Sequence, residues 1–250
     1  MIHIDSVVVR HGAVTAVDDV ALRVSAGLTA IIGPNGAGKS TLLAAVGRLI
    51  GTRAGVITVD GLDVATTRSR DIARRLAILR QDNHLAIRLS VEELIAYGRF
   101  PHGGSGRTPE DRELIERAID LLDLQAVRGR FLDELSGGQR QRAFVAMAIA
   151  QDTEYLLLDE PLNNLDPRHA VGLLKLLRRL VDERSMTVVV VLHDINVAAQ
   201  FADDIVAMRD GRVMHHGPVA SVVTAENLAG LYETPVRIAE IDGRIIALWE

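Results

Sequence analysis

Hydrophobic and polar residues alternate in short segments through the first sixty positions of the chain. Alternation with a period of two is typical of strands that bury one face, and it predicts strands over 2–9, 21–24, 28–32 and 56–59. Two later segments, 155–158 and 188–192, are apolar at every position. A strand that is apolar on both faces usually lies in the centre of a parallel sheet covered by helices. The pattern therefore predicts an α/β core.

The apolar spacing becomes helical between positions 88 and 150. Ser90 begins a capping box, and Thr108 followed by Pro109 is a second helix start with proline in the first turn. A third helix is expected to begin at Asp166. We therefore expect a single domain over 1–250, with a catalytic core over 1–84 and 151–250 and a helical subdomain inserted at about 85–150.

Turn residues mark the remaining connections. Asp210-Gly211 and Asp242-Gly243 each separate two strand-like segments and predict β-hairpins. Segment 101–106 is rich in proline and glycine, which predicts an exposed linker in which His102 faces solvent.

Composition limits the classes of function. The net charge of −5 argues against nucleic acid as a partner, because nucleic-acid binding needs a basic surface. The chain has no cysteine, which excludes disulfides and cysteine-ligated metals. Its first residues lack the basic start and apolar core of a signal peptide, and its apolar segments are too short to cross a bilayer. We expect a soluble protein.

A glycine-rich motif with the pattern G-x-x-x-x-G-K-[ST] follows the predicted strand 28–32 and precedes a helical segment, 41–50. In this context the motif binds the phosphates of a nucleoside triphosphate through backbone N–H groups and the helix N-terminus. The lysine is one of only two among 28 Lys and Arg residues, which suggests that this position needs a compact charge. The residues expected to bind nucleotide are Gly33, Pro34, Asn35, Gly36, Ala37, Gly38, Lys39, Ser40 and Thr41, with Lys39 over the β- and γ-phosphates and Ser40 as a ligand of Mg²⁺.

Two acidic residues end the apolar segment 155–158. Asp159 is placed to hold the Mg²⁺ shell, because it lies at the carboxyl end of a strand beside the phosphate-binding loop. Glu160 is then the candidate base that polarises the attacking water. An acidic turn before Pro161 is the alternative, and the neighbouring phosphate loop makes it the weaker one.

The segment Leu135-Ser136-Gly137-Gly138-Gln139 resembles the signature of ATP-binding cassette (ABC) ATPases. Ser136 and Gln139 also form a capping box, and both interpretations are compatible because a helix N-terminus with two glycines is an open anion site. The resemblance implies that Ser136, Gly137, Gly138 and Gln139 contact the γ-phosphate held by the phosphate loop of a second chain. One loop and one signature in this chain then imply two cassettes facing head to tail, most simply a homodimer.

The resemblance implies roles for further residues. Gln81 resembles the glutamine that contacts Mg²⁺ and signals to the transmembrane partner, and His193 resembles the switch histidine at the γ-phosphate; a purely structural histidine is the alternative. The segment Asn164-Leu165-Asp166 resembles the family's loop that links the two nucleotide sites across the dimer. Asp166 is also expected to cap a helix. At the position where the family usually has an aromatic residue that stacks on adenine, this chain has His11. His11 either stacks on the base or is an exposed turn residue. Val17 is expected to add an apolar contact with the base.

A closer resemblance is to the ATPases of ferric-siderophore importers. It is carried by segments 91–102, 133–144 and 160–166. It implies an enzyme that couples hydrolysis of ATP with Mg²⁺ to uptake through separate permease subunits and an extracytoplasmic substrate-binding protein, at the cytoplasmic face of the membrane. Leu85, Ile87 and Phe100 are then candidate contacts with the permease, with core packing as the alternative. Haem or cobalamin import and a soluble role in iron–sulfur cluster assembly are the alternative functions, and a nucleotide-binding regulator is a weaker one.

Overall fold

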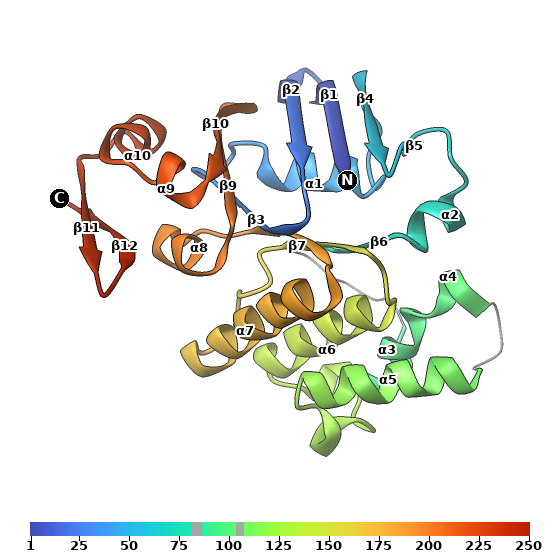
Figure 1. Ribbon diagram of the computed structural model, residues 1–250. Helices are drawn as coiled ribbons and strands as arrows, with labels where there is room; N and C mark the ends of the chain where they lie inside the picture. Colours follow the sequence, from blue (N-terminus) through green and yellow to red (C-terminus); the bar gives the residue numbers. More distant parts are fainter. Residues whose placement is uncertain (82–86, 104–107) are drawn as a thin grey trace.

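The computed structural model of the chain describes residues 1–81, 87–103 and 108–250. The described strands form three sheets, and most of the longer helices lie on the side of the largest sheet that faces away from β1, β2 and β4 (Figure 1). The strands are β1 (Ile2–His11), β2 (Val14–Val24), β3 (Gly27–Ile32), β4 (Ala54–Val59), β5 (Leu62–Asp63), β6 (Leu76–Leu79), β7 (Tyr155–Asp159), β8 (Thr187–Val191), β9 (Asp204–Arg209), β10 (Arg212–Pro218), β11 (Val236–Ile241) and β12 (Arg244–Trp249). The helices are α1 (Lys39–Val46), α2 (Ser69–Ala73), α3 (Val91–Tyr97), α4 (Phe100–Gly103), α5 (Pro109–Leu121), α6 (Gly137–Ala150), α7 (Pro167–Arg184), α8 (Ile195–Phe201), α9 (Val219–Val222) and α10 (Ala225–Tyr232), with short 3-10 turns at Gln125–Val127 and Leu132–Glu134.

The largest sheet has six strands in the order β10-β9-β3-β8-β7-β6. Its strands run parallel except β10, which returns antiparallel beside β9. The apolar segment of β8 is buried on both faces: Val188 and Val190 face one hydrophobic cluster and Val189 the other. The sequence-based prediction of central parallel strands is therefore confirmed.

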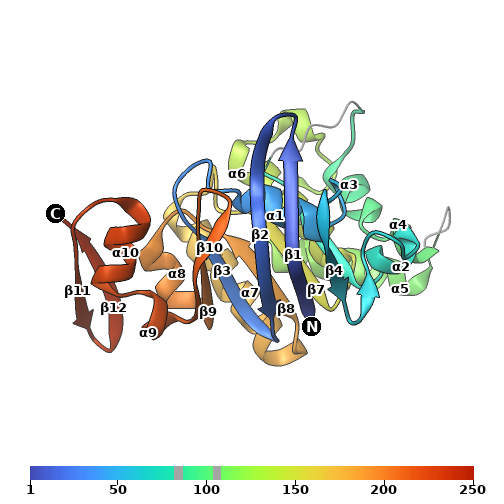
Figure 2. The ribbon, with the colours of Figure 1, turned by 90° about the horizontal axis from the view of Figure 1, so that it is seen from above.

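The two faces of this sheet are covered by different layers. On one face lies α1, beneath the four-stranded antiparallel sheet β2-β1-β4-β5 (Figures 1 and 2). On the other face lie the helices of the segment between β6 and β7, together with α7 and α8. The expected class, a mixed α/β sheet core with N-terminal antiparallel strands and inserted helices, is the observed one.

Helix and turn signals in the sequence match the observed boundaries closely. Ser90 and Thr108 make full capping boxes at the starts of α3 and α5, and Asp166 caps α7. In the hairpin β9–β10, Asp210 and Gly211 both have positive φ, 50° and 78°, as a two-residue type I′ turn requires. The Asp242-Gly243 hairpin joins β11 to β12 in the same way.

Three predictions about local structure were wrong. The strand expected over 21–24 begins at Val14, and the helix expected to reach residue 50 ends at Val46 before Gly47. Residues 101–103 belong to helix α4 rather than to a turn-rich linker, and 104–106 of the predicted linker lie outside the described residues. His102 is half-buried rather than fully solvent-facing: its Nε2 is buried, and burial is the main cause that lowers the pKa of its imidazole. The physical reason is tertiary, because Arg70 and Arg74 of the α2 region donate to the Pro101 carbonyl and hold α4 in place.

Candidate functional site

The phosphate-binding motif forms a loop between the end of β3 and the start of α1. Gly33 and Gly38 have φ of 143° and 93°, a region that residues with a side chain rarely adopt. A Cβ on Gly33 would lie 2.0 Å from the Met208 carbonyl oxygen, and one on Gly38 would lie 2.3 Å from the Ala16 carbonyl oxygen. Both glycines are therefore required by close approach of the backbone as well as by its conformation.

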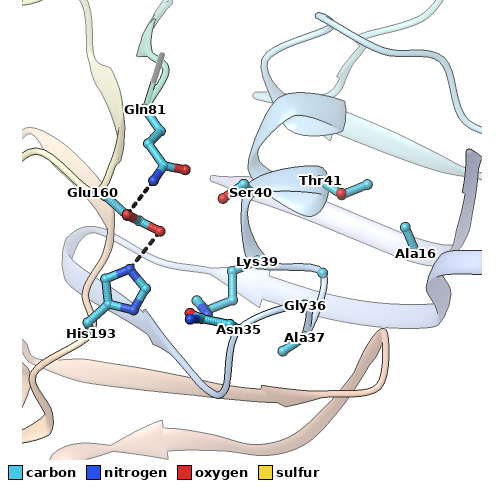
Figure 3. A pocket seen from close by; sticks show the side chains of 11 residues that line it. Ala16, Asn35, Gly36, Ala37, Lys39, Ser40, Thr41, Gln81, Glu160 and His193 are labelled. Carbon is cyan, nitrogen blue, oxygen red and sulfur yellow. Dashed lines mark hydrogen bonds and ion pairs between the residues drawn. The ribbon is translucent and has the colours of Figure 1, made fainter.

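This loop forms one wall of a cavity of about 680 Å³, which is the size of pockets that hold small ligands. Figure 3 shows the loop and the start of α1 on one side and residues from the ends of β6, β7 and β8 on the other. The residues that line the cavity are Ala16, Asn35, Gly36, Ala37, Gly38, Lys39, Ser40, Thr41, Gln81, Glu160 and His193. The cavity thus lies at the carboxyl ends of parallel strands, where open α/β sheets bind ligands.

The Lys39 ammonium is buried at the base of the loop. Its Nζ donates to the carbonyl oxygens of Gly33 at 2.8 Å and Pro34 at 2.9 Å. Burial lowers the pKa of Lys39, while the carboxylates of Glu160 and Asp159 act in the opposite direction. An ammonium has three N–H donors. Two are used by the loop, so one remains for a ligand in the cavity.

Ser40, which lines the cavity, contacts Asp159. The Ser40 Oγ donates to Asp159 Oδ1 at 2.9 Å. Burial raises the pKa of Asp159, and the Ser40 hydrogen bond partly offsets this. Hydroxyl, carboxylate and amide oxygens are the hard ligands that Mg²⁺ takes, usually with several waters and substrate phosphates completing its shell. The pair, with Gln81 nearby, fits such an ion, and within the described residues there is no cluster of three His, Cys, Asp or Glu side chains that would offer a site to another metal.

The Glu160 carboxylate is fixed from several sides. It accepts hydrogen bonds from Gln81 Nε2 and Asn163 Nδ2, both at 2.7 Å, and its Oε1 lies 2.7 Å from His193 Nε2 (Figure 3). The backbone of Glu160 has φ of 50°, an uncommon conformation for a non-glycine residue that turns the chain at the end of β7. The structure therefore places an oriented, largely buried carboxylate opposite the phosphate loop.

The structure brings most of the predicted residues together and adds two. Sequence reasoning did not assign a role to Asn163 or to Ala16, yet Asn163 orients Glu160 and Ala16 lines the cavity. A signal for Asn163 was present, since an amide in a turn three residues after an acidic side chain is within reach of it. No periodicity singles out Ala16.

Two predicted base contacts lie outside this cavity. Val17 is wholly buried opposite Val9 in the core, so the expectation that it contacts the base is wrong, and its neighbour Ala16 takes the exposed face of the strand. His11 is exposed at the end of β1, with its Nε2 3.4 Å from Thr41 Oγ1. It lines a smaller cavity with Thr41 next to the main one, so stacking on adenine stays a prediction.

The signature segment lies apart from the cavity of its own chain. Ser136 and Gln139 form a full capping box at the start of α6, with Gln139 N 3.3 Å from Ser136 Oγ. Gly138 lies against Asn164, because a Cβ on it would be 3.1 Å from the Asn164 carbonyl oxygen. Ser136 and Gly137 are exposed, and none of residues 136–139 is among those that line the cavity. The signature and the loop that precedes α7 thus form one exposed surface.

Two of the three candidate permease contacts lie among the described residues. Leu85 lies outside the described residues. Ile87 and Phe100 are 54% and 69% exposed, so core packing, the alternative for these two, is wrong. Within 1–81, 87–103 and 108–250, no helix has both the length and the apolar character needed to cross a bilayer.

Comparison with known proteins gives a consistent result. The model of the family described as ABC transporter matches residues 17–163, which is more than half of the chain. The chain is 41% identical to the petrobactin import ATP-binding protein YclP of Bacillus subtilis (strain 168), over 100% of this chain and 99% of that protein. It is 39% identical to the iron(3+)-hydroxamate import ATP-binding protein FhuC of the same organism, over 92% and 87%. The dimeric, post-hydrolysis structure of the ATP-binding cassette MJ0796 bound to ADP and Pi matches with a TM-score of 0.79 and 27% identity, over 88% of this chain and 99% of that chain. With the phosphate loop, the acidic pair Asp159-Glu160 and the signature in the observed places, the chain belongs to the ABC transporter family.

Proposed function

We propose that this chain is the ATP-hydrolysing subunit of an importer for ferric siderophores. The observation that carries the enzymatic part is the Glu160 carboxylate, held by Gln81, Asn163 and His193 across the cavity from Lys39. The import ATP-binding relatives, which match over at least 87% of either chain, support the transport part.

In the proposed reaction, residues 33–41 bind the triphosphate through backbone N–H groups, and Lys39 directs its remaining N–H at the β- and γ-phosphates. Ser40, Asp159 and Gln81 would hold Mg²⁺, which neutralises phosphate charge when bound. Glu160 orients a water molecule and takes its proton as the water oxygen bonds to the γ-phosphorus. The bond between that phosphorus and the β–γ bridging oxygen breaks, and ADP leaves with the electron pair. His193 and Asn163 keep the carboxylate in place throughout.

The proposed working unit is a homodimer of cassettes. The signature Ser136-Gly137-Gly138-Gln139 of one copy completes the site of the other, with Asp166 in the loop between them. Because phosphate charge is neutralised only when both copies close on it, binding favours the closed dimer and hydrolysis reopens it. That motion would be passed to permease subunits by the segment after Gln81, including Ile87 and Phe100.

The proposed setting follows from this assembly. The chain would lie at the cytoplasmic face of the membrane, bound to permease subunits that receive cargo from an extracytoplasmic substrate-binding protein. The division into a core, 1–84 and 151–250, and a helical subdomain at about 85–150 is part of the same proposal, because the two parts carry the cavity and the signature respectively.

The enzymatic proposal is tested with Glu160→Gln. The amide keeps the shape of the side chain but cannot take a proton, so we expect turnover to fall by about 100-fold or more while ATP affinity is kept. Calorimetry should show binding, and size-exclusion chromatography should show a stable ATP-dependent dimer. Glu113→Gln, which changes an exposed glutamate of α5 in the same way, is the matched control. A Glu160→Gln protein that hydrolyses ATP at the wild-type rate would refute the assignment.

The cargo needs a separate experiment, since no residue of this chain is expected to touch it. A deletion strain is complemented with the wild-type gene or the Glu160→Gln variant, and uptake of labelled ferric siderophore, haem and cobalamin is measured. Restoration of siderophore uptake by the wild type alone supports the proposal. Co-purification with soluble proteins only, with no effect on any uptake, would instead favour the iron–sulfur assembly role.

A further inference from the structure

The helix that follows His193 is held by the last strand of the chain. Helix α8 begins with Asp194 as its N-cap, whose Oδ1 accepts from the backbone N–H groups of Asn196 at 2.8 Å and Val197 at 3.2 Å. The position of this first turn fixes the backbone of His193, because His193 and Asp194 are adjacent. Anything that holds the first turn of α8 therefore also positions His193 against Glu160.

Asn196 connects this first turn to strand β12. Its Nδ2 donates to the Ala247 carbonyl oxygen at 3.2 Å, and its Oδ1 accepts from the Ala247 backbone N–H at 2.7 Å. The amide thus pairs with both polar groups of one residue, as a neighbouring strand would. Ala247 is buried, so loss of the amide would leave two backbone groups without a partner. Figures 1 and 2 show β11 and β12 at the side of the molecule near α8 and α10.

A second contact joins β12 to helix α10. The ring of Tyr232, at the end of α10, packs edge-on against Trp249 of β12, with centroids 5.3 Å apart and planes at 82°. Its hydroxyl is buried and has no hydrogen-bond partner in the described part of the chain. Burial raises the pKa of Tyr232, with the Asp194 carboxylate acting in the same direction and the backbone of Gly33 in the opposite one. The ring contact thus ties the end of α10 to β12.

We propose that the C-terminal hairpin β11–β12 is a positioning element of the nucleotide site, acting through Asn196 on His193. Asn196 does not line the cavity, so it is a positioning residue rather than a catalytic one. Coupling of this kind is reciprocal: nucleotide in the cavity changes the surroundings of the hairpin as the hairpin changes the site. The inference rests on the proposed binding of ATP.

The first test compares Asn196→Ala with Asn227→Ala. The Asn227 amide donates to the carbonyls of Ser221 and Val222, both at 3.2 Å, and so stabilises the same C-terminal part of the chain without touching α8. We expect Asn196→Ala to lower kcat by about 10-fold with KM for ATP nearly unchanged, since small displacements of a catalytic group are costly. Asn227→Ala should keep the wild-type kcat. Equal kcat values for the two folded variants would overturn the proposal.

The second test needs no substitution, because Trp249 is the one tryptophan of the sequence. Wild-type protein is titrated with a non-hydrolysable ATP analogue and Mg²⁺, and heat and indole emission are recorded, with excitation where adenine does not absorb. We expect emission to change with the same midpoint as the heat. Heat of binding with no change in emission overturns the positioning role alone. An absence of heat overturns the proposed function, and the inference with it.

Discussion

The Lys39 ammonium is solvated by its own loop before any ligand arrives, which explains why a buried cation is tolerated there. It donates to Gly33 and Pro34 and retains one N–H for the cavity. A guanidinium is larger, planar and rigid, and it could not fold back on two adjacent carbonyls while still pointing at a ligand. The use of lysine in a chain that otherwise favours arginine is thus explained by local geometry.

Replacing this ammonium should weaken binding directly. For Lys39→Ala we expect the Kd for ATP to rise by about 100-fold or more, because a buried charged hydrogen bond to phosphate is lost. Lys175→Ala, which removes the other lysine at an exposed position of α7, should bind ATP as the wild type does. Both values come from isothermal titration calorimetry. Equal affinities would contradict the assignment of the cavity.

Burial shifts the pKa of Asp159 in the opposite direction to that of Lys39. Burial raises the pKa of its carboxyl, which means that the native fold disfavours the charged form. Between its ordinary pKa and the raised one, the folded protein binds more protons than the unfolded chain, so stability falls as pH rises through that window. At neutral pH the ionised carboxylate therefore destabilises the protein when no Mg²⁺ is present.

Asp159→Asn should consequently stabilise the free protein. The amide oxygen can still accept from Ser40, and the buried charge is gone, so we expect Tm to rise by about 2–4 °C in chelator at neutral pH. The same variant should lose the further stabilisation that wild-type protein gains from Mg²⁺ with ATP. The measurement is thermal unfolding at neutral pH and at mildly acidic pH, where the gain should shrink. A lower Tm in chelator would show that the charge is not the dominant effect.

Glycines of the phosphate loop are needed for two reasons: a positive φ, and close contact with neighbouring backbone atoms. Alanine substitutions at different glycines separate the energetic costs of these two effects. Gly33→Ala combines a φ of 143° with a Cβ 2.0 Å from the Met208 oxygen, so we expect a loss of about 3 kcal/mol or more in unfolding free energy. Gly36→Ala has positive φ but open space around its Cβ and should lose about 1 kcal/mol. Gly129→Ala has neither a positive φ nor a close contact at its Cβ, so it should leave the free energy of unfolding unchanged. Urea unfolding gives the three values, and an equal effect at all three positions would contradict this account.

Elements were predictable where the signal is local. The continuous apolar segment of β8, the capping box at Ser90 and the Asp210-Gly211 turn each depend on neighbours within a few positions, and the structure has all three. His102 was misjudged because its burial comes from contacts between α2 and α4, which no short window contains. Val17 was misjudged because register shifts between β1 and β2 decide which residue faces the cavity.

The candidate site shows the same division between local and long-range information. Most of the residues that line the cavity could be located from their motifs, because strand ends and loops gather at one edge of the sheet. The Asn163 contact with Glu160 depends on the positive φ of Glu160 and was not foreseen. The position of the signature relative to the cavity also needed the structure, since helices α3 to α6 carry it on a separate surface.

We predict that a complete site requires two molecules, and mixing two inactive variants tests this. Lys39→Ala removes the cation of the cavity, while Gly137→Asp places a negative charge in the exposed first turn of α6, where an acidic residue is compatible with the helix. Each variant alone should be inactive. In a mixed dimer one site combines both defects and the other has neither, so random pairing should restore about one quarter of the wild-type ATPase rate. Mixing either variant with Glu160→Gln protein that also carries Lys39→Ala and Gly137→Asp should restore nothing. If each molecule hydrolysed ATP by itself, the activity of the mixture would not exceed the average of the two variants, and the head-to-tail arrangement would have to be abandoned.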